Sequence, residues 1–326
     1  MRSLLPRRLV LAAAGCLAAA ISVSALPQTF PSKPIRMVTQ FGIGAPGDLL
    51  VRTVASYMAE YIGQPVVVDN RTGAGGLIAA RVGASAAPDG YTIIALSAGV
   101  PVIQAVLGKQ LPLDPVKDLT PITGVGDTVS LIVAHPSVAG SLNELISVAK
   151  TQPGKLFYGT TGVGSQHHLA GEQINMLAGV SIVHVPYKVS PIADTASGAL
   201  PLTYVIASQG MPQVSAGKVK ALAVVGNSRS LQLPGVPTVD EVVAGFEPPP
   251  GWTGLFAPAG IPTSVLQRLH ADAVKAITSP ECTSKIVALA HEPIPSKSPE
   301  EFAALVKRQI ALVGRIVNAA GIKATE

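Results

Sequence analysis

The feature that most limits the fold of this chain is an alternation, from residue 35 onward, between short β-rich runs and amphipathic helical stretches. In the first unit an apolar strand over residues 35–41 leads through the glycine-rich turn 42–47 into a helix over residues 48–62. Gly63 and Pro65 then end that helix. This alternation is typical of parallel strands joined by crossover helices, so the pattern predicts an α/β fold of parallel sheets covered by helices.

The alternation falls into two series, separated by a proline-rich stretch over residues 111–121. The first series continues with strands at 66–69 and 91–96 and a helix at 77–86. The second has strands near 131–134, 156–159, 182–185, 202–206 and 219–225 and helices near 142–151, 168–178, 190–198 and 209–217. After the prolines at 248–250 come a strand at 252–256 and helices near 265–277, 280–289 and 299–320.

This order predicts two lobes. Because the last segment is mostly helical, we expect it to return and cover the sheet of the first lobe, which makes that lobe discontinuous in sequence. We expect lobe 1 to comprise residues 26–126 plus 250–326 and lobe 2 residues 127–249, with a ligand cleft between them. Hinge segments near 124–127 and 248–251 would let the lobes close.

The N-terminus has the pattern of an export signal. Arg2, Arg7 and Arg8 precede an apolar run over residues 9–21, and small residues end at Ala25, so we expect a signal peptide over residues 1–25 and a periplasmic protein. Two alternatives to an ordinary signal peptide remain open. One is a lipoprotein signal, because Cys16 follows a loose lipoprotein-type sequence, and the other is a twin-arginine signal, of which Arg7 and Arg8 would be half.

Charge and cysteine content exclude other classes once this signal is removed. The formal net charge of +5 falls to +2 without its three arginines, which argues against nucleic-acid binding. The 48% hydrophobic and 13% charged residues exclude disorder. If Cys16 leaves with the signal, Cys282 is alone and no intramolecular disulfide can form.

The turn Gly42-Ile43-Gly44-Ala45-Pro46-Gly47 matches the G-x-G-x-x-G pattern of dinucleotide-binding proteins, with Asp69 at the end of the next strand. An exported protein meets little nicotinamide cofactor, and Pro46 removes a backbone donor, so we expect no cofactor. The turn still directs backbone N–H groups and a helix N-terminus at one spot, which suits a carboxylate. Asp48 fits a helix cap better than a ligand contact.

A similar turn over residues 159–165 opens the helix near His168 in the other lobe. The two turns would face each other across the cleft, although glycine is also common in ordinary βα turns. Ser165 lacks the flanking glycines of a hydrolase nucleophile elbow, and no activated nucleophile, paired carboxylates or metal-ligand spacing is evident, so we expect no catalytic residues and no metal. His168 fits a hydrogen-bonding residue at the helix start better than a metal ligand.

Over nearly the whole chain after the signal, the sequence resembles the Bug family of tripartite tricarboxylate transporter substrate-binding proteins. The matching segments are FPSKPIR (30–36), GQPVVVDNR (63–71), GAGG (73–76), APDGYT (87–92), PGKL (153–156), HLAGE (168–172), VHVPYK (183–188), AGK (216–218) and PGVPTV (234–239). The resemblance implies a type II periplasmic binding fold, a small organic carboxylate as ligand, membrane permease subunits as partner, and a monomer.

The resemblance also implies the site residues. Both loops would offer mainly backbone donors to a carboxylate, with further side chains as cleft neighbours. The candidate ligand-binding residues are Ile43, Gly44, Ala45, Pro46, Gly47, Asp48, Ser97, Thr160, Thr161, Gly162, Gly164, Ser165, His168, Tyr187, Lys188, Tyr204 and Val205.

Two departures from the family pattern fall at positions that would contact the ligand. Gly42, Ala45 and Pro46 rearrange the first loop, which changes the number of N–H donors. The family often has phenylalanine-aspartate where this chain has Tyr204-Val205. Because valine cannot pair with an ammonium group, we expect amino acids to bind worse than mono- and dicarboxylates with uncharged bodies.

Two other functions remain as alternatives. One is an exported α/β enzyme, a dehydrogenase or hydrolase, which a glycine-rich turn after a strand also fits. The other is a receptor that signals without transport, since a closed binding protein presents the same surface to either partner.

Overall fold

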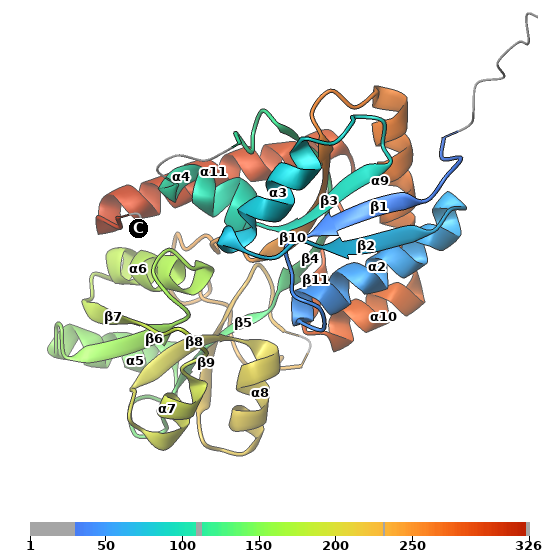
Figure 1. Cartoon of the computed structure of the whole chain (residues 1–326). Helices are drawn as coiled ribbons and strands as arrows, with labels where there is room; N and C mark the ends of the chain where they lie inside the picture. Colours follow the sequence, from blue (N-terminus) through green and yellow to red (C-terminus); the bar gives the residue numbers. More distant parts are fainter. Residues whose placement is uncertain (1–29, 109–112, 231, 324–326) are drawn as a thin grey trace, which may run out of the picture.

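The computed structural model describes residues 30–108, 113–230 and 232–323. The predicted signal peptide, with Cys16, lies outside the described residues. In these ranges two sheets form two lobes, one upper right and one lower left in Figure 1. No helix of the described ranges is both long and apolar enough to cross a membrane.

The first sheet has the strand order β11-β4-β10-β3-β1-β2. Its strands are β1 (Ile35–Thr39), β2 (Val66–Asn70), β3 (Thr92–Ser97), β4 (Leu119–Thr128), β10 (Trp252–Pro258) and β11 (His291–Pro293). Its helices are α2 (Pro46–Ile62), η1 (Ala74–Gly76), α3 (Leu77–Ala84), η2 (Gly99–Gln104), α4 (Ala105–Leu107), α9 (Thr263–Thr278), α10 (Pro280–Ala288) and α11 (Pro299–Ala320).

Alternation along the strands builds a core on each face of this sheet. On β3, Ile93 packs with α2, α9 and α10, whereas Ile94 packs with α3, η2 and α11. Trp252, Phe256 and Phe302 form an aromatic cluster in the second of these cores.

The second sheet has the order β7-β6-β8-β5-β9. Its strands are β5 (Ser130–Ala134), β6 (Leu156–Thr160), β7 (Ile182–Pro186), β8 (Leu202–Ile206) and β9 (Lys220–Val225). Its helices are α5 (Leu142–Thr151), α6 (Gln166–Ala178), α7 (Ile192–Ser197) and α8 (Ala207–Ser215). One face packs on α5 and α6 and the other on α7 and α8.

The predicted parallel pairing describes part of each sheet, because both sheets are mixed. β1 pairs in parallel with β2 and β3, and β6 with β7 and β8, but β10 runs antiparallel to β3 and β4, and β5 antiparallel to β8 and β9. The cause is the crossing between lobes. β4 carries the chain out of the first sheet and β10 carries it back, so these neighbours run in opposite directions.

The crossing joins the lobes at two adjacent segments. β4 ends at Thr128 and β5 begins at Ser130, while the returning chain enters β10 after Gly251. The Thr128 N–H donates to the Gly251 carbonyl over 3.4 Å. Residues 124–127, predicted as a hinge, lie within β4 and pair with β10 and β11.

Candidate ligand-binding cleft

The first glycine turn lies between β1 and α2, and its conformation is fixed from within. Ala45 is the N-cap of α2, Pro46 occupies the first helical position, and Gly44 has a φ of +78° that favours glycine. The Gly44 N–H donates to the Asp48 carboxylate over 2.9 Å, and the Ala45 N–H donates to the Gly42 carbonyl over 3.0 Å.

Asp48 is a buried structural residue. Its carboxylate accepts hydrogen bonds from Arg52 Nε at 2.9 Å and from Asn70 Nδ2 at 2.6 Å, in addition to Gly44, and the residue is 0% exposed. Burial alone would raise the pKa of this carboxyl, but the bonds from Arg52, Asn70 and Gly44 outweigh it and lower the pKa. The side chain therefore holds the glycine turn through Gly44 and does not act as the cap of α2, whose N-cap is Ala45, and only its backbone can face a ligand.

This arrangement fixes how many donors the first turn offers. The N–H groups of Gly44 and Ala45 are used internally, and Pro46 has none. Since the first N–H groups of a helix have no partner within it, Gly47 and Asp48 remain as donors at the start of α2. Ile43, 83% exposed, lines an open groove beside β2 and Arg52 instead of the space between the lobes.

The second turn, residues 160–165, is also held mainly by its own bonds. The Gly162 N–H donates to Thr160 Oγ1 at 3.2 Å, the Ser165 N–H to the Gly162 carbonyl at 3.3 Å, and the Gly164 N–H to His168 Nδ1 at 3.0 Å. The Ser165 hydroxyl caps α6 by accepting from the His168 N–H. Thr161 is exposed at the tip. The first backbone donors of α6, those of Gln166 and His167, remain.

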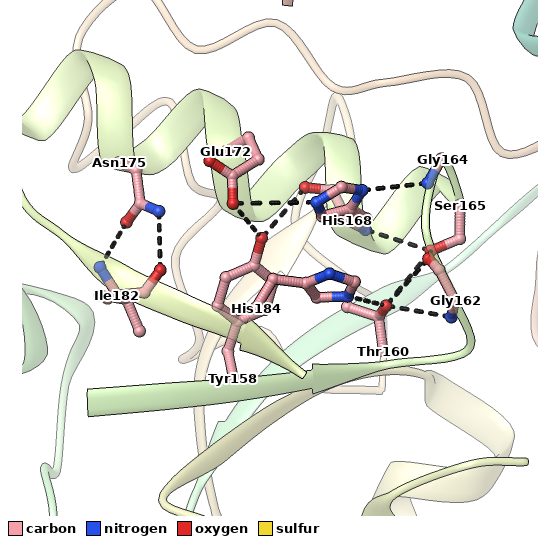
Figure 2. Close-up of polar contacts among 10 residues, drawn as sticks. All are labelled: Tyr158, Thr160, Gly162, Gly164, Ser165, His168, Glu172, Asn175, Ile182 and His184. Carbon is pink, nitrogen blue, oxygen red and sulfur yellow. Dashed lines mark hydrogen bonds and ion pairs between the residues drawn. The ribbon is translucent and has the colours of Figure 1, made fainter. Parts of the chain in front are cut away.

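His168 lies in the interior of lobe 2, behind this turn (Figure 2). Its ring stacks on His184 of β7 with centroids 3.9 Å apart, and its Nε2 lies 3.9 Å from Glu172 Oε1. Tyr187 supports the same turn from outside, because its N–H donates to the Thr160 carbonyl and its hydroxyl to Asp194. Lys188 is exposed beside it.

Tyr204 and Val205, predicted as cleft residues, are buried in the two cores of lobe 2. Consecutive strand residues point to opposite faces, and helices cover both faces of this sheet. Tyr204 therefore packs against Tyr158, and Val205 packs among Leu131 and the α8 side chains. At this strand end the residues that reach the space between the lobes are Ile206 and Ser208.

A cavity of about 130 Å³ lies between the lobes beside the crossing. It brings together three predicted residues, Pro46, Gly47 and Ser97; none of residues 160–165 is among its described lining. The rest of the lining is Phe41, Thr128, Ile206, Ser208, Gly251, Thr253, Leu289, Ala290 and His291. Burial lowers the pKa of His291, although its bond to the Leu289 carbonyl opposes this. At neutral pH the lining described thus carries hydroxyl groups, a neutral imidazole and apolar side chains, without a charged side chain.

Sequence reasoning missed the lobe 2 side of this cavity and the contribution of β11 in lobe 1. Ile206 and Ser208 follow the correctly predicted strand 202–206, so the signal was its carboxyl end, where α/β folds bind ligands. His291 lies on the three-residue strand β11, for which the sequence carries no signal. No cluster of three or more potential metal ligands occurs in the described residues.

Comparison with known proteins places these features in one family. The family described as tripartite tricarboxylate transporter family receptor matches residues 50–322. A UPF0065 protein of Cupriavidus necator, from the gbd 5′ region, is 33% identical, over 95% of this chain and 98% of its own length.

Two solved structures share both sequence and fold with this chain. Rpa4515 of R. palustris with adipate is 32% identical, with a TM-score of 0.75 over 90% of this chain and 99% of that one. MatC of Rhodopseudomonas palustris with bound malate is 29% identical, with a TM-score of 0.70 over 88% and 100%. The type II periplasmic binding fold is thereby confirmed, and the chain belongs to the tripartite tricarboxylate transporter receptor family.

Proposed function

We propose that this protein is a periplasmic receptor that closes its lobes around a small organic carboxylate and delivers it to the permease of a tripartite tricarboxylate transporter. The observation that carries the proposal is the cavity between the lobes, onto which the start of α2 and the start of α8 both open, through Gly47 and Ser208. Free N–H groups and the positive ends of two helix dipoles favour an anion there.

The remaining parts of the proposal follow from the sequence and from the family. The lobes would be residues 26–126 plus 250–326 and 127–249, exported by the signal over 1–25, with the protein acting as a monomer without cofactor. Relatives with adipate and malate support a carboxylate ligand. The start of α2, through the backbone donors of Gly47 and Asp48, and Ser97 would receive it in lobe 1. Residues 160–165 do not line this cavity, and in this proposal they reach the ligand when the lobes close.

The ligand class is tested by thermal shift and calorimetry on the protein from residue 26 onward. Adipate, malate, succinate and benzoate should raise the melting temperature, because a ligand that binds only the folded state stabilises it by mass action. Aspartate and glutamate should bind more weakly, since Val205 is buried and the cavity lining described has no carboxylate for an ammonium group. Tight aspartate binding without a response to the other acids would overturn this ligand class.

A pair of glycine variants tests the location. In Gly47→Ala the added methyl would overlap the Phe41 ring that lines the cavity, whereas a methyl at Gly42 meets no atom within 4 Å. Gly47→Ala should therefore weaken binding and Gly42→Ala should not. Equal affinities for both variants would place the ligand elsewhere.

Delivery to a permease is tested in cells that carry the transporter. Deleting the receptor should abolish uptake of a radiolabelled acid that the protein binds. Uptake that persists while an acid-induced transcriptional response disappears would instead assign the receptor to signalling.

A further inference from the structure

Two histidines from different elements are stacked beside the second glycine turn (Figure 2). His168 lies in the first turn of α6 and His184 on β7, with ring centroids 3.9 Å apart and an interplanar angle of 21°. The His168 side chain is only 8% exposed. Contact this close between two imidazoles is compatible with neutral rings and opposed by charge on both.

The direction of one hydrogen bond fixes the protonation of His168. The Gly164 N–H lies 3.0 Å from His168 Nδ1, and a backbone amide can only donate, so Nδ1 must carry a lone pair. The ring proton then belongs on Nε2, which faces Glu172 Oε1 at 3.9 Å. Protonation of Nδ1 would place two donors against each other and break the bond that holds Gly164.

His184 holds the other end of the same turn. Its Nε2 lies 2.7 Å from Thr160 Oγ1, and that hydroxyl oxygen also accepts the Gly162 N–H at 3.2 Å. The stacked pair therefore contacts the turn at its start, through Thr160, and near its end, through Gly164.

We propose that His168 and His184 are positioning residues, neutral at pH 7, that hold residues 160–165 in the ligand-receiving conformation, and that protonation of the pair in acid releases the turn and the ligand. This inference rests on the proposed function in that it assigns the turn to the ligand site.

The groups around the pair agree with this assignment. Burial lowers the pKa of His168, opposed by Glu172, and burial together with His168 lowers the pKa of His184 to about 4. Tyr158 of β6, which donates to Glu172 at 2.6 Å, and Tyr204 of β8 have pKa values raised by burial and remain neutral. His167 on α6 bonds instead to Ser130 Oγ, and burial lowers its pKa to about 4.

The sign of the pH effect follows from these shifts. A released turn exposes imidazoles with an ordinary pKa near 6.5, whereas the ordered turn holds them at lower values. The ordered state is therefore fully favoured above about pH 6.5 and loses that advantage as the pH falls toward about 4.

The tautomer is tested without any ligand, by nitrogen-15 NMR of the histidine rings and exchange of the Gly164 amide. At pH 7 His168 should show a proton on Nε2 and none on Nδ1, and the Gly164 amide should exchange slowly. Acidification should protonate the ring and speed that exchange together. A protonated Nδ1 at pH 7 overturns the inference, whether or not the protein binds carboxylates.

Variants then separate positioning from packing, with adipate as the calorimetric probe between pH 8 and pH 5.5. His168→Asn keeps an acceptor near Nδ1 but does not titrate, so its affinity should stay close to wild type at pH 8 and become less dependent on pH. His168→Leu removes the acceptor and should bind about fivefold more weakly throughout. His135→Asn, at a partly exposed histidine elsewhere in lobe 2, is the control and should behave as wild type.

Two outcomes are decisive. If His168→Asn binds as weakly as His168→Leu, or keeps the wild-type pH dependence, the positioning role is wrong. If wild type binds none of the acids at any pH, the proposed function fails, and the NMR measurement still decides the role of the histidines.

Discussion

The first glycine turn depends on the buried carboxylate of Asp48, which joins the turn, α2 and β2 through Gly44, Arg52 and Asn70. Asp48→Asn removes the charge that all three donors share and should lower the free energy of unfolding by about 2 kcal/mol. Because its folded-state pKa is lowered, this contribution is present above pH 4 and is lost as the pH falls through the folded-state pKa.

Urea denaturation at pH 7 and pH 3.5 measures this difference. Asp240→Asn, at an exposed position, serves as the matched control and should change stability by less than about 0.5 kcal/mol. A loss for Asp48→Asn that is equal at both pH values would show that the charge is not what holds the turn.

Asp127, near the end of β4, has a carboxyl group whose pKa is shifted in the opposite direction to that of Asp48. Its Oδ1 is inaccessible and has no hydrogen-bond partner within the described residues, and Glu292 stands opposite it in the β4–β11 ladder. Burial raises the pKa of Asp127 to about 7, a bond from Thr128 opposes this, and Glu292 adds to it. A raised pKa means that stability is greatest below pH 4 and declines as the pH rises through 7.

Asp127→Asn should therefore stabilise the protein selectively at high pH. The gain over wild type should be roughly 2 to 4 kcal/mol larger at pH 8 than at pH 4.5, as urea denaturation would measure. Glu292→Gln should give a smaller gain in the same direction. A constant difference between variant and wild type across this range would mean that Asp127 is ionised throughout.

Individual residues show which parts of the candidate site could be predicted from the sequence and which could not. Gly47 and Ser97 could be placed at the cavity because each follows a correctly predicted strand or turn. Tyr204 and Val205 could not be placed, because burial on both faces of β8 depends on α6 and α8 packing onto it. The hydrogen bond from the Gly44 N–H to the Asp48 carboxylate could not be predicted either, because the position of that carboxylate depends on its bond to Asn70 of β2.

Among the elements, Gly251 marks a close approach between the crossing and α6. An added methyl there would overlap the side-chain amide of Gln166, the first residue of α6 and a neighbour of the second glycine turn. Gly251→Ala should therefore turn the Gln166 amide away from the crossing and weaken ligand binding by no more than about fivefold, the equivalent of about 1 kcal/mol. Calorimetry with adipate measures the change.

A second substitution identifies the cause. Gln166→Ala removes the overlapping amide, so the double variant should recover most of the affinity that Gly251→Ala loses. Gly235→Ala is the control, because a methyl at Gly235 meets no atom within 4 Å. Independent, additive effects of the two substitutions would exclude steric contact as the reason.

Most helices and strands could be predicted to within a few residues, and the two strands of the described residues that could not share a physical reason. β4 contains Pro121, Gly124 and Gly126, residues that strands usually avoid. Its neighbour β10 accommodates them with register shifts, and the absence of a side chain at Gly124 admits the Ile294 carbonyl. β11 has three residues and exists only through its pairing with β4. Tertiary contacts, not local pattern, create both strands.

At the scale of the whole molecule, the lobes share a core across their boundary. α6 belongs to lobe 2, yet its Leu169 is fully buried in the lobe 1 core that holds Trp252 and Phe302, and α6 lies beside α11 (Figure 1). A receptor that must open and close needs lobes that move without separating. We expect the contact between α6 and α11 to hold the lobes together while the cleft changes width.

This shared core predicts that the lobes unfold together. Trp252 is the only tryptophan and reports lobe 1, whereas far-ultraviolet circular dichroism reports both lobes, so their urea transitions should coincide. Leu169→Ala should cost about 2 to 4 kcal/mol and separate the two transitions, since it opens a void at the boundary. Leu145→Ala, equally buried but within lobe 2 alone, should lower stability while the transitions still coincide. Two separate transitions in wild type would show instead that each lobe folds independently and that Leu169 does not couple them.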